Sequence, residues 1–188
     1  ADPEAQFGVG LLTFAQGFEG LGQGFYRHGL DIEAGREFGL FFPVPANPNP
    51  APLDYGSFRG IINGFVIAMD RAEVAFQSAR DGDYVVPLDL MQLRLDLNGD
   101  GTAADDEMIG GLLLAMISGD NPVTGGAALH SVEIGFDAAD AIWFSGYTQV
   151  FAAQGDFLLA HDFHRLFEVA FHRLFPRAGL PMQDFVKS

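Results

Sequence analysis

Residues 7–25 read FGVGLLTFAQGFEGLGQGF, and this stretch decides the fold class. Its large apolar residues recur at alternating steps of four and three, which is the spacing of one face of an α-helix. Those residues are Phe7, Leu11, Phe14, Phe18, Leu21 and Phe25. On another face, Gly10, Gly17 and Gly24 repeat every seven residues. Each glycine costs a helix about 1 kcal/mol against alanine, so we expect close packing by a neighbouring helix to hold the segment.

Two further elements follow this helix. Residues 43–52 (PVPANPNPAP) contain five of the ten prolines, which predicts an extended strap laid over the surface of a helical bundle. A second helix is expected from about Ser57, as its N-cap, to Arg80, because apolar residues then recur with helical spacing until residues 81–83 (DGD) end it.

The second half of the chain is less regular. The loose alternation of residues 85–97 fits either a short strand or a broken helix. A third helix is expected from Asp105 to about Ile117, followed by a Gly-, Pro- and Asn-rich loop over residues 118–135. Residues 138–175 predict one long helix, or two with a break near Gly155. The expected fold is all-α: a single helical-bundle domain of four to five helices spanning residues 1–188.

Composition narrows the classes of function. The 25 acidic against 10 basic residues give a net charge of −15, which argues against nucleic acid and anionic membranes as partners. No apolar run approaches the roughly 20 residues needed to span a bilayer. The absence of cysteine excludes disulfides, thiol catalysis and thiolate metal sites.

The most specific motif is DLNGDGTAADDE at residues 96–107. It matches the calcium-loop pattern D-x-[DN]-x-[DN]-G-x5-E at every specified position. A hard divalent cation takes six to eight oxygen ligands at about 2.3–2.6 Å, and alternate residues of a tight loop turn toward one centre. The expected ligands of Ca²⁺ are side-chain oxygens of Asp96, Asn98 and Asp100, the Thr102 carbonyl and both carboxylate oxygens of Glu107.

This loop resembles that of the EF-hand superfamily, and the resemblance covers residues 96–107 together with a plausible exiting helix. Two features depart from the paired EF-hand pattern: the eighth position is Ala103, and no second loop is present in the sequence. We therefore expect one ion with a structural role, pinning the loop between two halves of the bundle, rather than a sensor that opens on binding. Another hard cation could occupy the same loop.

A second candidate metal site lies near the carboxyl end. On one continuous helix, His161, His164, Glu168 and His172 would share an arc of about 80°. His164 with Glu168, or Glu168 with His172, could then hold zinc or copper. The arc lies opposite the apolar face and beside arginines, so an ordinary solvated face is the favoured interpretation.

Three functions therefore remain open. The favoured one is a non-enzymatic calcium-binding protein with a protein or small-molecule partner. The second is a metalloenzyme or transition-metal-binding protein that uses the histidine-rich segment. The third is a carrier of an apolar ligand, with Phe14, Phe18, Phe65 and Trp143 as its wall.

A periplasmic or secreted location is expected. Residues 1–4 (ADPE) are typical of a start left by signal-peptide cleavage, and a calcium loop suits a calcium-rich compartment. The segments LRLDLNGDG and FDxADxxWxxGY, together with the histidine-rich end, resemble exported bacterial proteins, a likeness that implies no activity.

Overall fold

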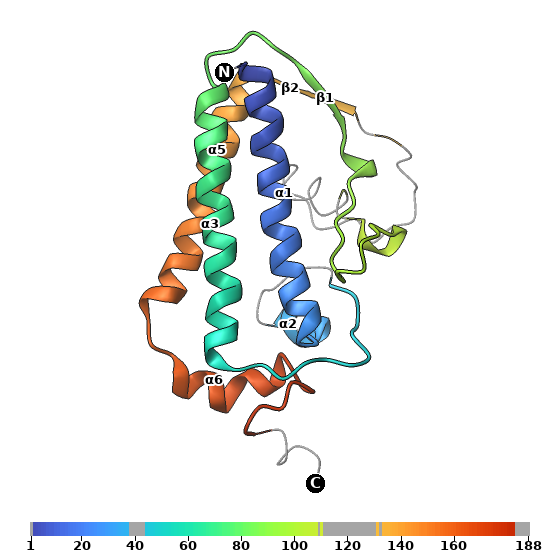
Figure 1. Ribbon diagram of the computed structural model, residues 1–188, viewed down its shortest axis with the longest axis vertical. Coiled ribbons are helices and arrows are strands. Elements are labelled where there is room, and N and C mark those ends of the chain that lie inside the picture. Colours follow the sequence, from blue (N-terminus) through green and yellow to red (C-terminus); the bar gives the residue numbers. More distant parts are fainter. Residues whose placement is uncertain (1, 38–43, 109, 111–130, 132, 183–188) are drawn as a thin grey trace.

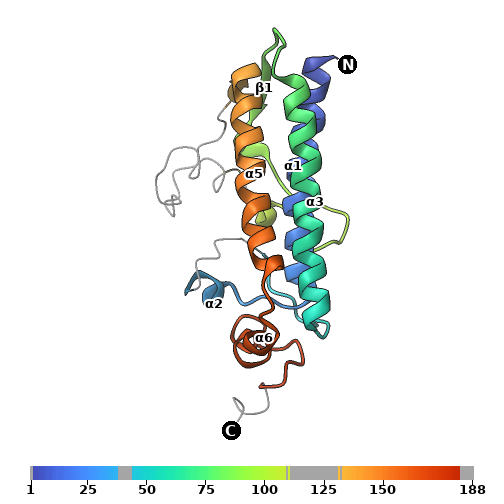
Figure 2. The ribbon, with the colours of Figure 1, turned by 90° about the vertical axis from the view of Figure 1, so that its left-hand side faces the viewer.

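The computed structural model describes residues 2–37, 44–108, 110, 131 and 133–182. Three long helices, α1 (Pro3–Arg27), α3 (Tyr55–Ala79) and α5 (Ala138–Ala160), lie side by side (Figures 1 and 2). Two shorter helices, α2 (Ile32–Glu37) and α6 (His164–Ala170), lie at one end of this bundle. The prediction of a mostly helical fold is confirmed, with one small sheet in addition.

The sheet lies at the other end of the bundle and consists of β1 (Val86–Asp89) and β2 (Glu133–Phe136). The strands run antiparallel, with Val86 opposite Phe136 and Asp89 opposite Glu133. A 3₁₀ turn, η1 (Leu90–Gln92), follows β1. Of the two structures predicted for this region, a strand or a broken helix, residues 86–89 form the strand. Residues 133–135, which we expected in a loop, belong to a strand because residues 86–89 supply a hydrogen-bonding partner.

The glycine face of α1 packs against α3, as the seven-residue spacing predicted. A Cβ atom at Gly10 would lie 2.7 Å from the ring of Phe76. At Gly17 it would lie 2.5 Å from Cε of Met69, and at Gly24 it would lie 2.8 Å from Cγ2 of Ile61. All three contacts are on α3, so the glycines allow the two helices to approach more closely than side chains would permit.

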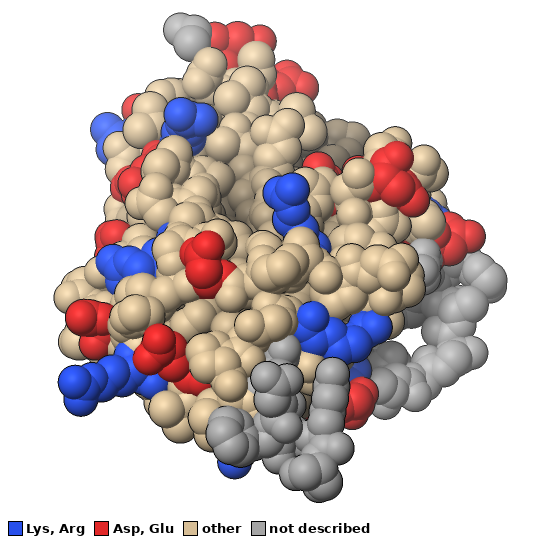
Figure 3. All heavy atoms as spheres, turned by 60° about the horizontal axis from the view of Figure 1, so that its bottom comes forward, with Lys and Arg blue, Asp and Glu red and all other residues tan. Residues whose placement is uncertain are grey.

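The proline-rich strap is neither helix nor strand over residues 44–54, with a bend at residues 48 and 49, and residue 43 lies outside the described residues. The amide of Asn47 donates to the Tyr26 carbonyl at 2.8 Å, and the Ala51 N–H donates to the Arg27 carbonyl at 2.8 Å. The Leu53 N–H donates to the Ala178 carbonyl at 2.9 Å. The strap thus joins the end of α1 to the carboxyl-terminal segment. Around this end of the molecule, acidic and basic side chains are interspersed (Figure 3).

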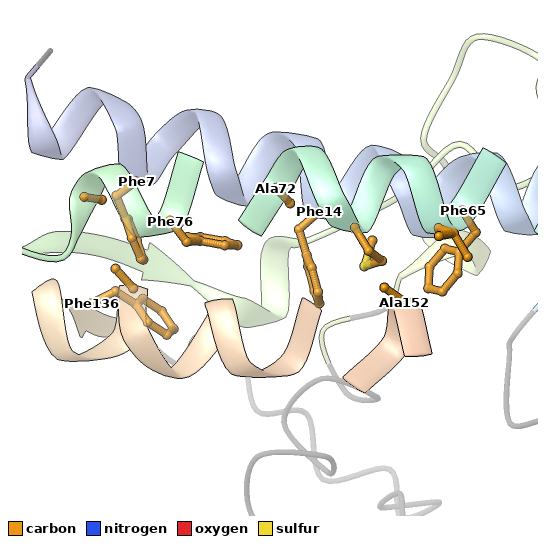
Figure 4. Packing of buried hydrophobic residues seen from close by; sticks show 11 residues of the cluster. Phe7, Phe14, Phe65, Ala72, Phe76, Phe136 and Ala152 are labelled. Carbon is orange, nitrogen blue, oxygen red and sulfur yellow. The ribbon is translucent and has the colours of Figure 1, made fainter. Parts of the chain in front are cut away.

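Aromatic side chains fill the space between the three long helices (Figure 4). Phe7 and Phe76 are fully buried and lie 5.8 Å apart between ring centroids. Phe14 and Phe18 of α1 both contact Phe151 of α5, at 6.1 and 5.2 Å. Tilted and edge-to-face ring pairs of this kind add about 0.5–1.5 kcal/mol each beyond the area they bury. The burial of these apolar rings is the main contribution to the stability of the bundle.

Helix α3 begins two residues before Ser57. Its N-cap is Asp54, whose Oδ1 accepts the Ser57 N–H at 2.6 Å, so Ser57 lies inside the helix and the predicted N-cap is wrong. Asp and Ser are both favoured N-caps, and their separation of three residues is the spacing between a cap and the amide it accepts.

The Asp54 cap makes one pH-dependent prediction. Hydrogen bonds from Ser57 hold the pKa of Asp54 below its ordinary value of 3.8. Because the folded pKa is lowered, the contribution of the cap is complete above about pH 4 and is lost as the pH falls through the folded pKa. We expect the melting temperature of the wild type to exceed that of Asp54→Ala between pH 3 and pH 7, by a difference that narrows only below about pH 4. A gap independent of pH would contradict this.

The predicted break of the last helical region is wrong in position. Helix α5 continues through Gly155 to Ala160, and α6 starts at His164 after an extended His161. Gly155 lies inside α5, and a Cβ there would lie 2.4 Å from Cγ2 of Val66 on α3. This glycine therefore allows close helix packing and does not break the helix. A 3₁₀ turn, η3 (Phe171–Arg173), follows α6.

The predicted third helix does not begin at Asp105. Residues Asp105–Glu107 form one 3₁₀ turn, η2, and Met108 is extended, with φ −72° and ψ 118°. Residues 109 and 111–117, and the loop expected over residues 118–130, lie outside the described residues. None of the helices in the described ranges has both the length and the apolar character needed to cross a membrane.

Candidate metal-binding loop

Residues 96–107 form a loop on the α1 side of the bundle (Figure 1). A short antiparallel bridge between Arg94 and Met108 closes its base, and the Leu95 N–H donates to the Glu107 carbonyl at 3.2 Å. The guanidinium of Arg94 also holds Asp105 Oδ1 at 2.8 Å. An EF-hand loop follows a helix, whereas extended backbone enters this loop. Its last three residues, Asp105–Glu107, form the 3₁₀ turn η2.

The loop is anchored to α1. The Gln23 side-chain amide donates to the Asp96 carbonyl at 2.8 Å, and the Asp96 N–H donates to Glu19 Oε2 at 3.3 Å. Leu95 and Leu97 are buried in a small cluster with Ala15 and Phe18 of α1 as well as Leu93. The described contacts thus place the loop against one helix, and not between two halves of the bundle as we expected.

Within the loop, side-chain oxygens accept the backbone amides that a tight turn leaves unpaired. Asp96 Oδ1 accepts the N–H groups of Gly99 and Asp100, at 2.7 and 3.1 Å, and its Oδ2 accepts that of Gly101 at 2.9 Å. Gly99 and Gly101 adopt φ of +76° and +86°, a region that favours glycine. Gly101, the one glycine that the sequence pattern specifies, therefore has the positive φ of a sharp turn, and Gly99 shares it.

The same arrangement continues at the next two alternate positions. Asn98 Oδ1 accepts the Asp100 N–H, and Asp100 Oδ1 accepts the Thr102 N–H, both at 2.8 Å. Asp100 and Thr102 are exposed. The candidate ligands of the first half of the loop are thus held in place by backbone contacts that need no ion.

The side chain of Glu107 is fully buried, with a relative exposure of 0%. Its Oε1 accepts the N–H groups of Leu97 and Asn98 at 2.8 and 2.9 Å. Its Oε2 accepts the Ala104 N–H at 2.9 Å. The carboxylate of Glu107, the last residue of the motif, therefore holds the beginning and the end of the loop together.

The chemistry of the donor set fits a hard cation. Each carboxylate oxygen has two acceptor positions, so those that accept one N–H keep capacity for an ion. Glu107 Oε2 and Asp96 Oδ2 each accept one described N–H, whereas Glu107 Oε1 accepts two. Glu107 therefore offers one oxygen readily, where the sequence predicted two. In the described part of the chain no group of three or more His, Cys, Asp or Glu is placed to hold a metal ion, so the acidic ligands are not preassembled around a centre.

The histidine-rich segment does not form the predicted arc. His161 is the C-cap of α5, His164 begins α6, and His172 belongs to η3. The one close pair is His164 Nε2 with Glu168 Oε1 at 3.7 Å, and His164 also stacks on Tyr55 at 4.9 Å. The helical-wheel argument for four ligands on one helix is wrong, because the chain leaves helical geometry between His161 and His164.

The four residues proposed as the wall of an apolar carrier are not brought together around a cavity. Phe14, Phe18 and Phe65 pack on one another, with centroids 5.0 and 5.1 Å apart, and fill the core. Trp143 is 41% exposed and stacks beside Tyr147 at 4.1 Å. Three of the predicted wall residues thus belong to the core, and Trp143 lies at the surface.

An open cleft of about 620 Å³ lies beside the loop. Its walls come from the second half of α1, the strap and the loop, and include Gln23, Arg27, Asn47, Asn49 and Asn98. Sequence reasoning missed Glu19, Gln23 and Arg94 as supports of the loop, since their partners lie at a distance along the chain or across the loop and no local pattern marks them.

Comparisons of the chain with protein-family models, with curated proteins and with solved structures found no match.

Proposed function

We propose that this chain is a non-enzymatic calcium-binding protein in which residues 96–107 bind one Ca²⁺ that stabilises the loop against α1. The observation that carries the proposal is Glu107: a fully buried carboxylate, without a described basic partner, at the final ligand position of the loop. Burying an unpaired charge is costly, and a cation next to it would offset that cost.

The other donors support the same ion. Asp96, Asn98, Asp100 and the Thr102 carbonyl supply hard oxygens at alternate positions, and hard oxygens are what Ca²⁺ prefers. When bound, the ion would supply positive charge among three carboxylates that otherwise repel one another. Export to a calcium-rich compartment would suit this role and remains part of the proposal.

The contacts around the loop favour a structural role over a sensor. Its base is closed by the Arg94–Met108 bridge, and its first residue is fixed to α1 through Glu19 and Gln23. A sensor exposes a new surface when two flanking helices reorient, and extended backbone enters this loop in place of such a helix. The ion would therefore stabilise one arrangement instead of switching between two.

Calcium is expected to raise the melting temperature by about 5–10 °C over excess chelator. An ion that binds only the folded chain adds RT ln(1 + [L]/Kd), about 2.7 kcal/mol at one hundred times Kd. For a chain of this size 1 kcal/mol corresponds to roughly 2–4 °C. Melting followed by circular dichroism in calcium and in chelator, together with titration calorimetry, measures the effect.

Asp100→Asn is the matched variant for this experiment. It keeps a side-chain oxygen for the Thr102 N–H but removes one ligand charge, so the melting temperature in chelator should stay near that of the wild type while calcium affinity falls about tenfold or more. Equal wild-type melting in calcium and chelator, with no heat of binding, would refute the proposal. Stoichiometric zinc or copper in the purified protein would support the transition-metal alternative.

A further inference from the structure

Helix α5 has an unusual distribution of side-chain sizes. The residues that it buries most deeply are small, namely Ala141, Ser145, Thr148, Ala152 and Gly155. The larger Phe144, Phe151 and Leu159 are partly buried against the core. The large apolar residues on its opposite face are exposed, with relative exposures of 59% for Ile142, 41% for Trp143, 54% for Val150 and 67% for Phe157. A helix that is satisfied by one bundle exposes polar residues on its outer face. The outer face of α5 therefore has the composition of a second packing surface.

The exposed residues follow a strict seven-residue repeat. Trp143, Val150 and Phe157 form one row of large side chains, and Gly146, Ala153 and Ala160 form a second row of small ones. All six are exposed. Two such rows, three residues apart, make the a and d positions of a coiled-coil seam, which needs a second helix to complete it.

Gly146 supports this interpretation in context. No atom of the described residues lies within 4 Å of a Cβ built at Gly146, so the internal packing of the chain does not require glycine there. Gly8, Gly20, Gly60 and Gly64 have equally open surroundings, so openness alone identifies no contact. What distinguishes Gly146 is its place in the small row of the seam, where it would admit a large side chain from outside.

We propose that the outer face of α5 binds the same face of a second copy of this chain, with the two helices antiparallel. In one antiparallel register, every large residue of one copy lies opposite a small residue of the other. The pairs are Trp143 with Ala160, Gly146 with Phe157, and Val150 with Ala153, each formed twice about the two-fold axis. A parallel pair would instead place large residues against large and small against small. The pattern is therefore self-complementary in the antiparallel sense, as a two-fold interface requires.

Charge on this face allows two copies of an acidic chain to meet. Of the 25 acidic residues only Asp140 and Asp156 lie on α5, and the helix has no basic residue. In the proposed register Asp156 lies opposite Tyr147, whose hydroxyl can donate to it, and Gln149 lies opposite Gln154. Among the residues of α5 no like charges are opposed along the seam, and the nearby Glu73 of α3 accepts a hydrogen bond from Gln149 at its edge.

The extent of the surface is sufficient for a specific dimer. A 23-residue helix is about 35 Å long. With roughly 150–250 Å² for each aromatic side chain and exposures of 41–67%, the large apolar residues of two copies would together bury roughly 700–900 Å², to which the small and polar residues of the face add. Specific protein interfaces start at about this size.

The first experiment compares two valine substitutions by sedimentation equilibrium. Val150→Glu places a carboxylate in the central layer and should raise the dimer dissociation constant at least about 100-fold. Val74→Glu is the matched control, since Val74 is an exposed valine (66%) on α3, away from the seam. The control should leave the dimer intact. Circular dichroism and melting of both variants show that the fold is kept.

The second experiment tests the register by disulfide trapping, and the natural chain contains no cysteine to interfere. In the antiparallel pair, two copies of Ala160→Cys hold their sulfurs about 25 Å apart, too far to cross-link. An oxidised mixture of Ala160→Cys with Trp143→Cys should give a covalent heterodimer, and neither variant alone should cross-link. A monomeric wild type, a dimer sensitive to Val74→Glu but not to Val150→Glu, or cross-linking of one variant with itself would overturn the proposal.

Discussion

Glu107→Ala is expected to lower the free energy of unfolding by about 3 kcal/mol even when calcium is removed by chelator. The substitution leaves three loop amides, those of Leu97, Asn98 and Ala104, without their acceptor. Each buried unpaired amide costs about 1–3 kcal/mol, and the relief of burying a charge offsets part of the total. Such a loss is a large share of the 5–15 kcal/mol that stabilises a typical domain.

Glu107→Gln separates the hydrogen bonds of this side chain from its charge. The glutamine oxygen can serve either Ala104 or the pair Leu97 and Asn98, and its NH₂ group then faces the remaining donors. We therefore expect a smaller loss than for alanine, with no calcium response. Urea unfolding gives the free energies, and hydrogen exchange at the amides of Leu97 and Asn98 should accelerate selectively.

Asp105→Asn is the control for both Glu107 variants. The Asp105 side chain is 91% exposed and contacts Arg94 at the rim of the loop, so its loss should change stability by less than about 1 kcal/mol. If Glu107→Ala proved as mild as Asp105→Asn in chelator, the buried carboxylate would not be holding the loop together.

Alanine substitutions at two pairs of glycines in α1 are expected to have opposite signs. Gly10→Ala with Gly24→Ala introduces Cβ atoms 2.7 Å from the Phe76 ring and 2.8 Å from Ile61, with a net cost of about 2 kcal/mol after the gain in helix propensity. Gly8→Ala with Gly20→Ala meets no described atom within 4 Å and should stabilise the chain by about 1–2 kcal/mol.

Both double variants replace two glycines of α1 by alanine, so the gain in helix propensity is the same in each. The difference in stability between them therefore measures the close packing of α1 with α3. Thermal melting should separate the two double variants by roughly 10 °C. Equal stabilisation of both would mean that α1 and α3 can move apart at little cost, and the close approach would then not be a determinant of stability.

These glycines also show what the sequence could predict. Along α1 the apolar spacing and the seven-residue glycine spacing are local patterns, and both define faces of one helix. The same reasoning failed at Gly155, because a glycine that allows close packing and a glycine that ends a helix look alike without the partner, here Val66. The actual break, at residues 161–163, has neither glycine nor proline to mark it.

For the loop, the sequence predicted the sharp turn at Gly101 and the inward carboxylate of Glu107, because both follow from spacing within twelve residues. It left the backbone that enters the loop open between a strand and a broken helix, and it wrongly started a helix at Asp105, where the chain forms a 3₁₀ turn. The loop is attached to α1 through Gln23 and Glu19, which precede their partner Asp96 by 73 and 77 positions in the sequence. No local sequence pattern contains that information.

The strap has a consequence for the order in which the chain acquires its structure during synthesis. Helices α1 and α3 can pair once residue 79 has left the ribosome, because all of their close contacts lie within that length. The strap can then bond to the end of α1 but cannot complete its contacts. Leu53 still lacks Ala178, and Pro48 lacks Arg177, 129 positions downstream. Contacts of such long sequence separation form slowly. For most of translation the nascent chain therefore holds a paired hairpin of α1 and α3 without its carboxyl-terminal segment. At the uncovered end of this hairpin, the apolar residues Leu53 and Phe58 are available to chaperones until that segment packs on them.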